Sequence, residues 1–174
     1  MSTLSFKKTK LIALSGLLAA MTFVITMIHV PTGNGYTHAG DGVIYLAACI
    51  LPTPYAVVSS AVGGLLADGL SGAAIWIPAT IIIKALTALF FSPNTSKIVC
   101  PRNVMAIIPS LIICVLGYTV YEGVFILGGL SWAIIGSAFV QLPSYIVQII
   151  ASSVLYISIG LVLDKMNFKE KYLK

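Results

Sequence analysis

The stretch Val43–Leu70, VIYLAACILPTPYAVVSSAVGGLLADGL, decides how many helices this chain forms. It is apolar almost throughout and longer than the roughly 20 residues that a transmembrane helix needs. Pro52 and Pro54 stand near its middle, and a proline inside a helix removes a backbone hydrogen bond and kinks or breaks the helix. The stretch is therefore either one kinked span or two helices joined by a tight turn.

The composition of the whole chain is that of an integral membrane protein. Of its 174 residues, 59% are hydrophobic and only 9% are charged, whereas a soluble domain carries about 25% charged residues. The apolar residues form unbroken runs, and not the alternation typical of barrel strands, which indicates helices. The length allows one domain of roughly five to seven spans at about 20 residues each.

The positions of the basic residues indicate which of the two interpretations of Val43–Leu70 is correct, because Lys and Arg concentrate in cytoplasmic loops. If Pro52 and Pro54 form a tight cytoplasmic turn, every basic residue except Lys84 falls on one side of the membrane. Those residues are Lys7, Lys8, Lys10, Lys97, Arg102, Lys165, Lys169, Lys171 and Lys174. We therefore expect an all-α membrane protein of six helices in one bundle, with both termini in the cytoplasm.

The six helices are expected to form a single membrane domain over residues 1–174. Their expected ranges are about 10–30, 39–51, 55–70, 76–91, 104–127 and 134–163. The second helix is short: at 1.5 Å per residue it reaches about 20 Å, less than the roughly 30 Å of the hydrocarbon core. A short helix leaves a recess on the outer side, and we expect the Gly-rich extracellular loop before it, residues 31–40, to cover that recess.

The polar residues of the apolar segments are expected at a similar depth in the membrane, in its extracellular half. Lys84 lies near the middle of a span, where an ionisable group is costly and usually faces a bundle interior or a polar cavity. Helical spacing puts aromatic rings beside hydrogen-bonding groups, which is typical of a small-molecule pocket. The expected substrate-binding residues are Tyr36, His38, Asp41, Asp68, Trp76, Lys84, Tyr118, Glu122, Gln141, Tyr145 and Gln148.

Each of these residues also has a purely structural interpretation. Lys84 could form an ion pair with Asp68 or Glu122, and Asp41 could cap the second helix. The glutamines could bridge neighbouring helices, and the tyrosines could lie at the membrane interface. The shared depth of the whole group favours a binding site over these separate interpretations.

The chain carries no recognisable catalytic motif. It lacks the Gly-x-x-x-x-Gly-Lys-Ser/Thr phosphate loop, so we do not expect it to hydrolyse ATP. The segment GLSGA at 69–73 lacks the spacing of a serine-hydrolase elbow, and Cys49, Cys100 and Cys114 lack metal-ligand spacing. We expect a binding protein that is not an enzyme, with no catalytic residues, no metal, no cofactor and no nucleic-acid partner.

Three segments resemble the substrate-binding S component of energy-coupling factor (ECF) vitamin transporters. They are ALSGLLAA at 13–20, GYTHAGDGVIYLAACILPTPYAVVSSAVGGLLADGLSG at 35–72 and WIPATIIIKAL at 76–86. The likeness extends over about residues 11–163. It points to the branch that includes hydroxymethylpyrimidine-, pyridoxine- and riboflavin-type S components.

The resemblance implies high-affinity capture of a vitamin outside a prokaryotic cell membrane, followed by docking on the coupling subunit EcfT. Two ABC-type ATPases, which use ATP and Mg, would drive release inside. Hydroxymethylpyrimidine or a form of vitamin B6 is the preferred ligand, and riboflavin or another vitamin is the alternative. Small residues four apart let a partner helix approach closely, and the resemblance assigns the docking surface to Ser15, Gly16, Ala19 and Ala20.

Two other classes of function stay open at this stage. A stand-alone secondary carrier or channel would use the buried charges as an ion path. A membrane scaffold would bind a protein partner and no small ligand.

Overall fold

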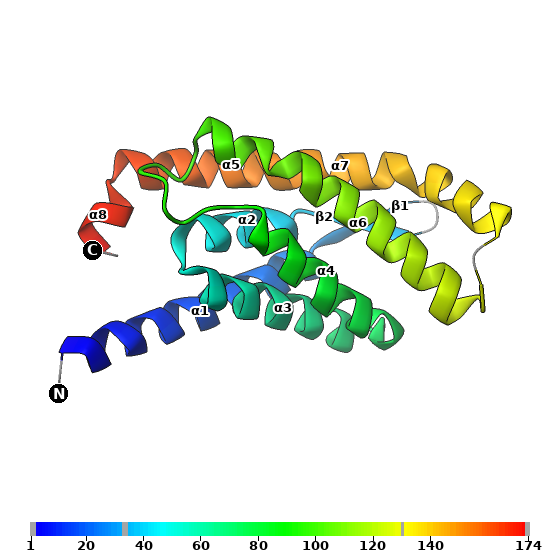
Figure 1. Ribbon diagram of the computed structural model, residues 1–174, viewed down its shortest axis with the longest axis horizontal. Helices are drawn as coiled ribbons and strands as arrows, with labels where there is room; N and C mark the ends of the chain where they lie inside the picture. Colours follow the sequence, from blue (N-terminus) through cyan, green and yellow to red (C-terminus); the bar gives the residue numbers. More distant parts are fainter. Residues whose placement is uncertain (1–2, 33–34, 130, 173–174) are drawn as a thin grey trace.

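The computed structural model describes residues 3–32, 35–129 and 131–172, and these are mainly helical (Figure 1). In chain order the elements are α1 (Thr3–Met27), β1 (His29–Thr32), β2 (Gly35–His38), α2 (Gly40–Ile50), α3 (Thr53–Leu70), the 3-10 turn η1 (Ala74–Trp76), α4 (Ile77–Leu89), α5 (Pro101–Met105), α6 (Ile107–Tyr121), the π-helical η2 (Glu122–Ile126), α7 (Trp132–Lys165) and α8 (Phe168–Tyr172).

Three helical stretches of the described chain are long and apolar enough to cross a membrane: Lys7–Met27, Pro101–Ile126 and Phe139–Lys165. Large apolar side chains on them, such as Leu17 and Ile150, are more than half exposed. Such wide exposure of apolar side chains is unfavourable in water and favourable in the hydrocarbon core of a membrane. The expected helical membrane protein is confirmed in this form, whereas the number of crossings and their direction stay predictions.

The stretch Val43–Leu70 is two helices and not one kinked helix. α2 ends at Ile50, and the backbone of Leu51 and Pro52 is extended. α3 then begins at Thr53 with Pro54 in its first turn, where the missing N–H has no helical partner to lose. The prolines therefore end one helix and start the next.

α2 lies at the centre of the molecule, and each of its residues is buried. A helix that is apolar on all sides must be surrounded, and α1, α3, α4 and α7 pack around this one. The Tyr45 ring stacks on Phe91 with 4.7 Å between centroids, and its edge meets Tyr156 at 6.0 Å. Because α2 is only 11 residues long, its first turn, with Asp41, lies inside the protein.

The segment before α2 differs from the expected irregular loop. It is an antiparallel β-hairpin in which His29 faces His38 and Thr32 faces Gly35, with residues 33–34 outside the described chain. α1 ends at Met27, earlier than the expected residue 30, because Pro31 cannot continue a helix. β2 packs against α7, where the Thr37 hydroxyl donates to the Ser144 carbonyl at 3.2 Å.

The helix expected at 104–127 is divided. α5 is separated from α6 at Ala106, and the last turns, Glu122–Ile126, are π-helical. The final long helix, α7, is longer than the expected 134–163 and carries Pro143 in its interior. Its first turn is capped by the Ser131 side chain, which accepts from the Ile134 amide.

The first turns of α1 and the short α8 lie at the same end of the bundle (Figure 1). There, Lys10 lies over the Tyr172 ring, with its Nζ 5.7 Å from the ring centroid. The loop between α4 and α5 meets the same end: the Asp164 carboxylate accepts from the Ile98 and Val99 amides at 2.7 and 2.9 Å. These contacts place the chain ends and this basic loop on one side.

Candidate functional site

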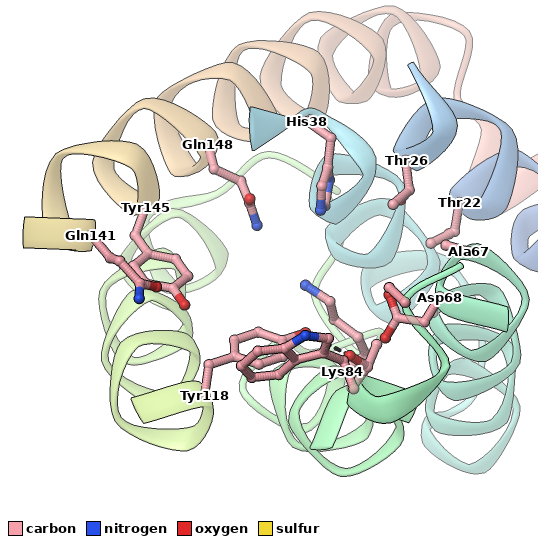
Figure 2. Close-up of a pocket in the computed structure, with 14 residues that line it drawn as sticks. Thr22, Thr26, His38, Ala67, Asp68, Lys84, Tyr118, Gln141, Tyr145 and Gln148 are labelled. Carbon is pink, nitrogen blue, oxygen red and sulfur yellow. Dashed lines mark hydrogen bonds between the residues drawn. The ribbon is translucent and has the colours of Figure 1, made fainter. Parts of the chain in front are cut away.

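A cavity of about 250 Å³ lies under the hairpin, between α1, α3, α4, α6 and α7. Figure 2 shows aromatic rings and hydrogen-bonding groups turned toward the same space. Eight of the residues expected from the sequence line it: His38, Asp68, Trp76, Lys84, Tyr118, Gln141, Tyr145 and Gln148. Residues far apart in the chain therefore meet in one mixed polar and aromatic pocket.

The floor of the cavity is a buried ion pair. Lys84 Nζ on α4 donates to Asp41 Oδ1 on α2 at 2.6 Å. Gln148 on α7 donates to the other carboxylate oxygen, Oδ2, at 2.8 Å. The alternative interpretation from the sequence, an ion pair of Lys84 with Asp68 or Glu122, differs from the structure, because the short α2 places Asp41 in the protein interior.

One wall of the cavity is aromatic. The rings of Tyr118 and Tyr145 are stacked with 6.3 Å between centroids, and the Trp76 ring meets Tyr118 at 6.0 Å. The Tyr118 hydroxyl and the Thr80 hydroxyl share a hydrogen bond of 3.0 Å, and Lys84 Nζ lies 5.9 Å from the Tyr118 ring centroid. Such a wall can stack a flat ring, and its hydroxyls can orient it.

His38 closes the cavity from the hairpin side (Figure 2). Its Nδ1 accepts the Gly40 amide at 3.1 Å, which leaves the ring proton on Nε2. Burial lowers the pKa of His38 from 6.5 to about 4, and the charge of nearby Lys84 acts in the same direction, against an opposite effect of Asp41. The imidazole is therefore neutral at physiological pH.

Two of the expected site residues, Asp41 and Glu122, do not line the cavity. Asp41 lies behind Lys84 and reaches the space only through its partners. Glu122 begins the π-helical segment and lies beside Gln141, with 3.5 Å between Gln141 Nε2 and Glu122 Oε2. The backbone of Tyr36 belongs to β2, but its side chain lies outside the described part of the chain.

The expected set omitted several residues of the cavity wall. They are Thr22, Thr26, Gly64, Ala67, Ala73 and Thr80. Thr22 and Thr26 stand four apart on α1, a spacing that marks one helix face, and this was the signal that could have found them. Gly64 is needed for packing, since a Cβ there would lie 2.7 Å from the Thr80 side chain.

The expected docking residues lie on a different surface, between α1 and α3. Ser15, Gly16 and Ala19 line an apolar groove of about 430 Å³, together with residues of α3 such as Pro54 and Val58. A Cβ added at Gly16 would meet nothing within 4 Å. Ala19 is buried against α3 and Ala20 is exposed beside the groove, so this small-residue face serves internal packing as well as an open groove.

The site offers binding groups and lacks a metal cluster. No set of three or more His, Cys, Asp or Glu side chains in residues 3–32, 35–129 and 131–172 is grouped to hold a metal ion. The polar groups that face the cavity are a neutral imidazole, a paired ammonium, amides, hydroxyls and the Asp68 carboxylate. This combination suits a flat polar molecule.

Comparison with protein families agrees with this geometry. A family described as the ECF-type riboflavin transporter, S component, matches residues 6–165. No curated protein matches the sequence significantly. The match spans nearly the whole chain, including every helix that contributes to the cavity. The chain therefore belongs to the S component family of ECF-type riboflavin transporters, whose members are membrane-embedded substrate-binding subunits of transporters and not enzymes.

Proposed function

We propose that this protein captures a heterocyclic vitamin or vitamin precursor from outside the cell and passes it to an ECF module. That module would consist of the coupling subunit EcfT and two ABC-type ATPase subunits. The observation that carries the proposal is the cavity beneath the hairpin, in which aromatic rings and hydrogen-bonding groups from five helices converge. Family membership supports the same role.

The proposed topology has six crossings with both termini inside. The basic residues of the chain, apart from Lys84, would then face the cytoplasm. The common position of the start of α1, the α4–α5 loop and α8 supports this arrangement. The hairpin and the cavity would lie toward the outside of a prokaryotic cell membrane.

Two ligands are supported by different observations. A compact single-ring ligand such as hydroxymethylpyrimidine or a form of vitamin B6 suits a cavity of about 250 Å³, which is slightly below the roughly 300–1,000 Å³ typical of ligand sites. Riboflavin, a larger three-ring molecule, is favoured by the description of the matching family. Both carry the ring and the polar edge groups that the aromatic wall and the amides would contact.

The groove between α1 and α3 is the proposed docking surface for EcfT. Gly16 leaves its floor open, and the groove wall is almost entirely apolar. A helix of the coupling subunit could approach closely there, as small residues at four-residue spacing allow. The groove is separate from the cavity, so ligand binding and docking would use different residues.

The chain offers a direct binding assay. It contains two tryptophans: Trp76 lines the cavity, whereas Trp132 is 87% exposed. In a Trp132→Phe variant, the remaining fluorescence reports on the cavity alone. Purified protein is titrated with riboflavin, hydroxymethylpyrimidine, pyridoxine and pyridoxamine, and we expect saturable quenching at micromolar concentration or below for one of them.

A titration in which none of these vitamins binds would overturn the proposal. Transport then separates it from a secondary carrier. Proteoliposomes that hold this chain alone should not accumulate the vitamin, whereas proteoliposomes with EcfT, both ATPases and ATP should. Accumulation by the chain alone, driven by an ion gradient, would favour the carrier instead.

A further inference from the structure

We propose that Asp68 determines which molecules the cavity accepts, by requiring a hydrogen-bond donor on the ligand. The donor would be an N–H or O–H group, best of all a protonated amine or ring nitrogen. This inference rests on the proposed vitamin-binding function and names the chemistry of the ligand edge that faces α3.

The buried Asp68 carboxylate, which interacts with the Thr80 hydroxyl, keeps one oxygen without a hydrogen-bond partner. Asp68 is 6% exposed and lines the cavity. Its Oδ2 makes no hydrogen bond within the described parts of the chain. A buried polar atom left unpaired costs roughly 1–3 kcal/mol, and more when it is charged, so a ligand group that donates to Oδ2 would recover that cost.

The charge of Lys84 acts on Asp68, but Lys84 forms its ion pair with Asp41 instead. The Lys84 ammonium lies 2.6 Å from the Asp41 carboxylate. His38 contributes no positive charge, since burial lowers its pKa to about 4. With Lys84 and Asp41 compensating each other, Asp68 leaves the cavity wall with an excess of negative charge.

At the floor of the cavity the ligand needs a hydrogen-bond acceptor instead of a donor. A lysine ammonium has three N–H donors, and one of those on Lys84 bonds to Asp41. The remaining donors suit a carbonyl oxygen or ring nitrogen of the ligand. In Figure 2 the Asp68 carboxylate and the Lys84 ammonium approach the cavity from different directions, which fits a ring with a donor on one edge and an acceptor on another.

This arrangement disfavours anionic forms of the same vitamins. A phosphate brings up to two negative charges and no obligatory donor, and it would face the uncompensated Asp68 in a setting of low dielectric. The cavity should therefore take free or protonated vitamins in preference to their phosphate esters.

Matched pairs of ligands test the idea in a protein that keeps Asp68. Riboflavin is compared with riboflavin 5′-phosphate, and pyridoxamine with pyridoxamine 5′-phosphate, by quenching of Trp76 in the Trp132→Phe background. For whichever of the two vitamins binds, we expect the free form to bind at least tenfold more tightly than its phosphate ester. Equal or tighter binding of the phosphate ester would overturn the assignment without using any variant of Asp68.

An isosteric variant then ties the preference to the residue. Asp68→Asn keeps the volume of the side chain and removes its charge. We expect a loss of at least tenfold in affinity for the free form and a smaller ratio between free and phosphorylated forms. Glu170→Gln is the matched control, because it removes one carboxylate from the exposed face of α8, far from the cavity.

The outcomes distinguish this inference from the function on which it rests. Tight vitamin binding that is unchanged in a folded Asp68→Asn protein, with an unchanged ratio for the phosphate ester, would overturn the role of Asp68 alone. Absence of vitamin binding in the parent protein would overturn both. Folding is checked by the elution profile and the apparent Tm.

Discussion

The ammonium of Lys84 lies 2.6 Å from the carboxylate of Asp41, and the two side chains are only 5% and 1% exposed. The pair joins α4 to α2 at the floor of the cavity, and Gln148 extends the connection to α7. Lys84, which lies in the middle of the apolar helix α4, is thus fixed by the first turn of the central helix. The same contact helps to hold the fold together and shapes the binding site.

Breaking this pair should lower the stability of the folded protein. Lys84→Met leaves the Asp41 carboxylate buried without a counter-charge, which typically costs about 3–5 kcal/mol. We expect a clear drop in the apparent Tm in detergent. The double variant Lys84→Met, Asp41→Asn should recover part of that loss, because neither partner is then charged.

Lys97→Met serves as the control for the loss of a lysine, since Lys97 is exposed in the α4–α5 loop. Its free energy of unfolding should stay within about 0.5 kcal/mol of that of the parent, so its apparent Tm should hardly change. A Lys84→Met protein as stable as Lys97→Met would contradict the structural role of the pair.

The stability of the protein should fall as the pH drops below 6.5. The folded pKa of His38 is lowered to about 4, so between these values the unfolded chain binds a proton that the folded chain does not. The loss begins near pH 6.5, grows as the pH falls and levels off below about pH 4, at about 3 kcal/mol. Protonation would also remove the acceptor that Nδ1 offers to the Gly40 amide.

Apparent Tm values between pH 7.5 and 4 test this prediction. His38→Gln removes the titrating group and should flatten the profile, leaving only the contribution of the carboxylates. The groups that face the imidazole are Asp41, Lys84 and His29. A profile that is equally steep in both proteins would show that another group is responsible.

Gly42→Ala should prevent normal packing of α2 on α7. A Cβ at Gly42 would lie 2.4 Å from the carbonyl oxygen of Ser152, and a backbone atom cannot turn away as a side chain can. We expect a loss of at least 2 kcal/mol, in the range of overpacked sites. Gly136→Ala is the control, because nothing lies within 4 Å of its added Cβ and alanine favours the helix.

Removing the aromatic wall should weaken binding without unfolding the protein. Trp76→Ala deletes the ring that meets Tyr118, and we expect at least a tenfold higher Kd for the bound vitamin, equivalent to about 1.4 kcal/mol. Isothermal titration measures it, since the fluorescent reporter is lost. Phe125→Ala removes a ring that is 73% exposed and should leave the Kd unchanged; similar effects of both substitutions would argue against a specific role of the wall.

Filling the α1–α3 groove should reduce transport without changing the affinity for the vitamin. Gly16→Leu adds bulk where a Cβ meets no neighbour, so the protein should fold and bind its vitamin with the parent Kd. We expect uptake with EcfT and the ATPases to fall at least tenfold. Ala13→Leu, also exposed on α1 but outside the groove, should transport normally, and equal uptake by both variants would remove the groove from the docking surface.

Much of the cavity wall could be predicted because its polar residues interrupt apolar helices. Lys84 and Gln148 are conspicuous in such segments, and helical spacing alone predicts that Trp76 and Lys84 lie on one face of the expected helix 76–91. Thr22 and Thr26 were harder to find, since threonine is common in membrane helices and carries no charge. Their role depends on which face of α1 turns inward, and the small residues of α1 do not settle that orientation.

The partner of Lys84 could not be predicted from the sequence. Asp41, Asp68 and Glu122 all lay at a suitable depth, and the choice among them depends on how far α2 enters the bundle. The hairpin was missed for a related reason: its strands are only four residues long, and they are held by β2 packing on α7 rather than by a strong local pattern.

The sequence by itself determined a helical membrane protein, two helices separated by the prolines at 52 and 54, and a gathering of polar groups at one depth. These follow from hydrophobicity, from the missing proline N–H and from the cost of placing charge in lipid, all of which act locally along the chain. Only the tertiary structure decided that Asp41 neutralises Lys84 and that one oxygen of Asp68 is left without a hydrogen-bond partner. Pairing depends on how distant helices pack together, and a buried charge is stabilised by the group that packing brings beside it.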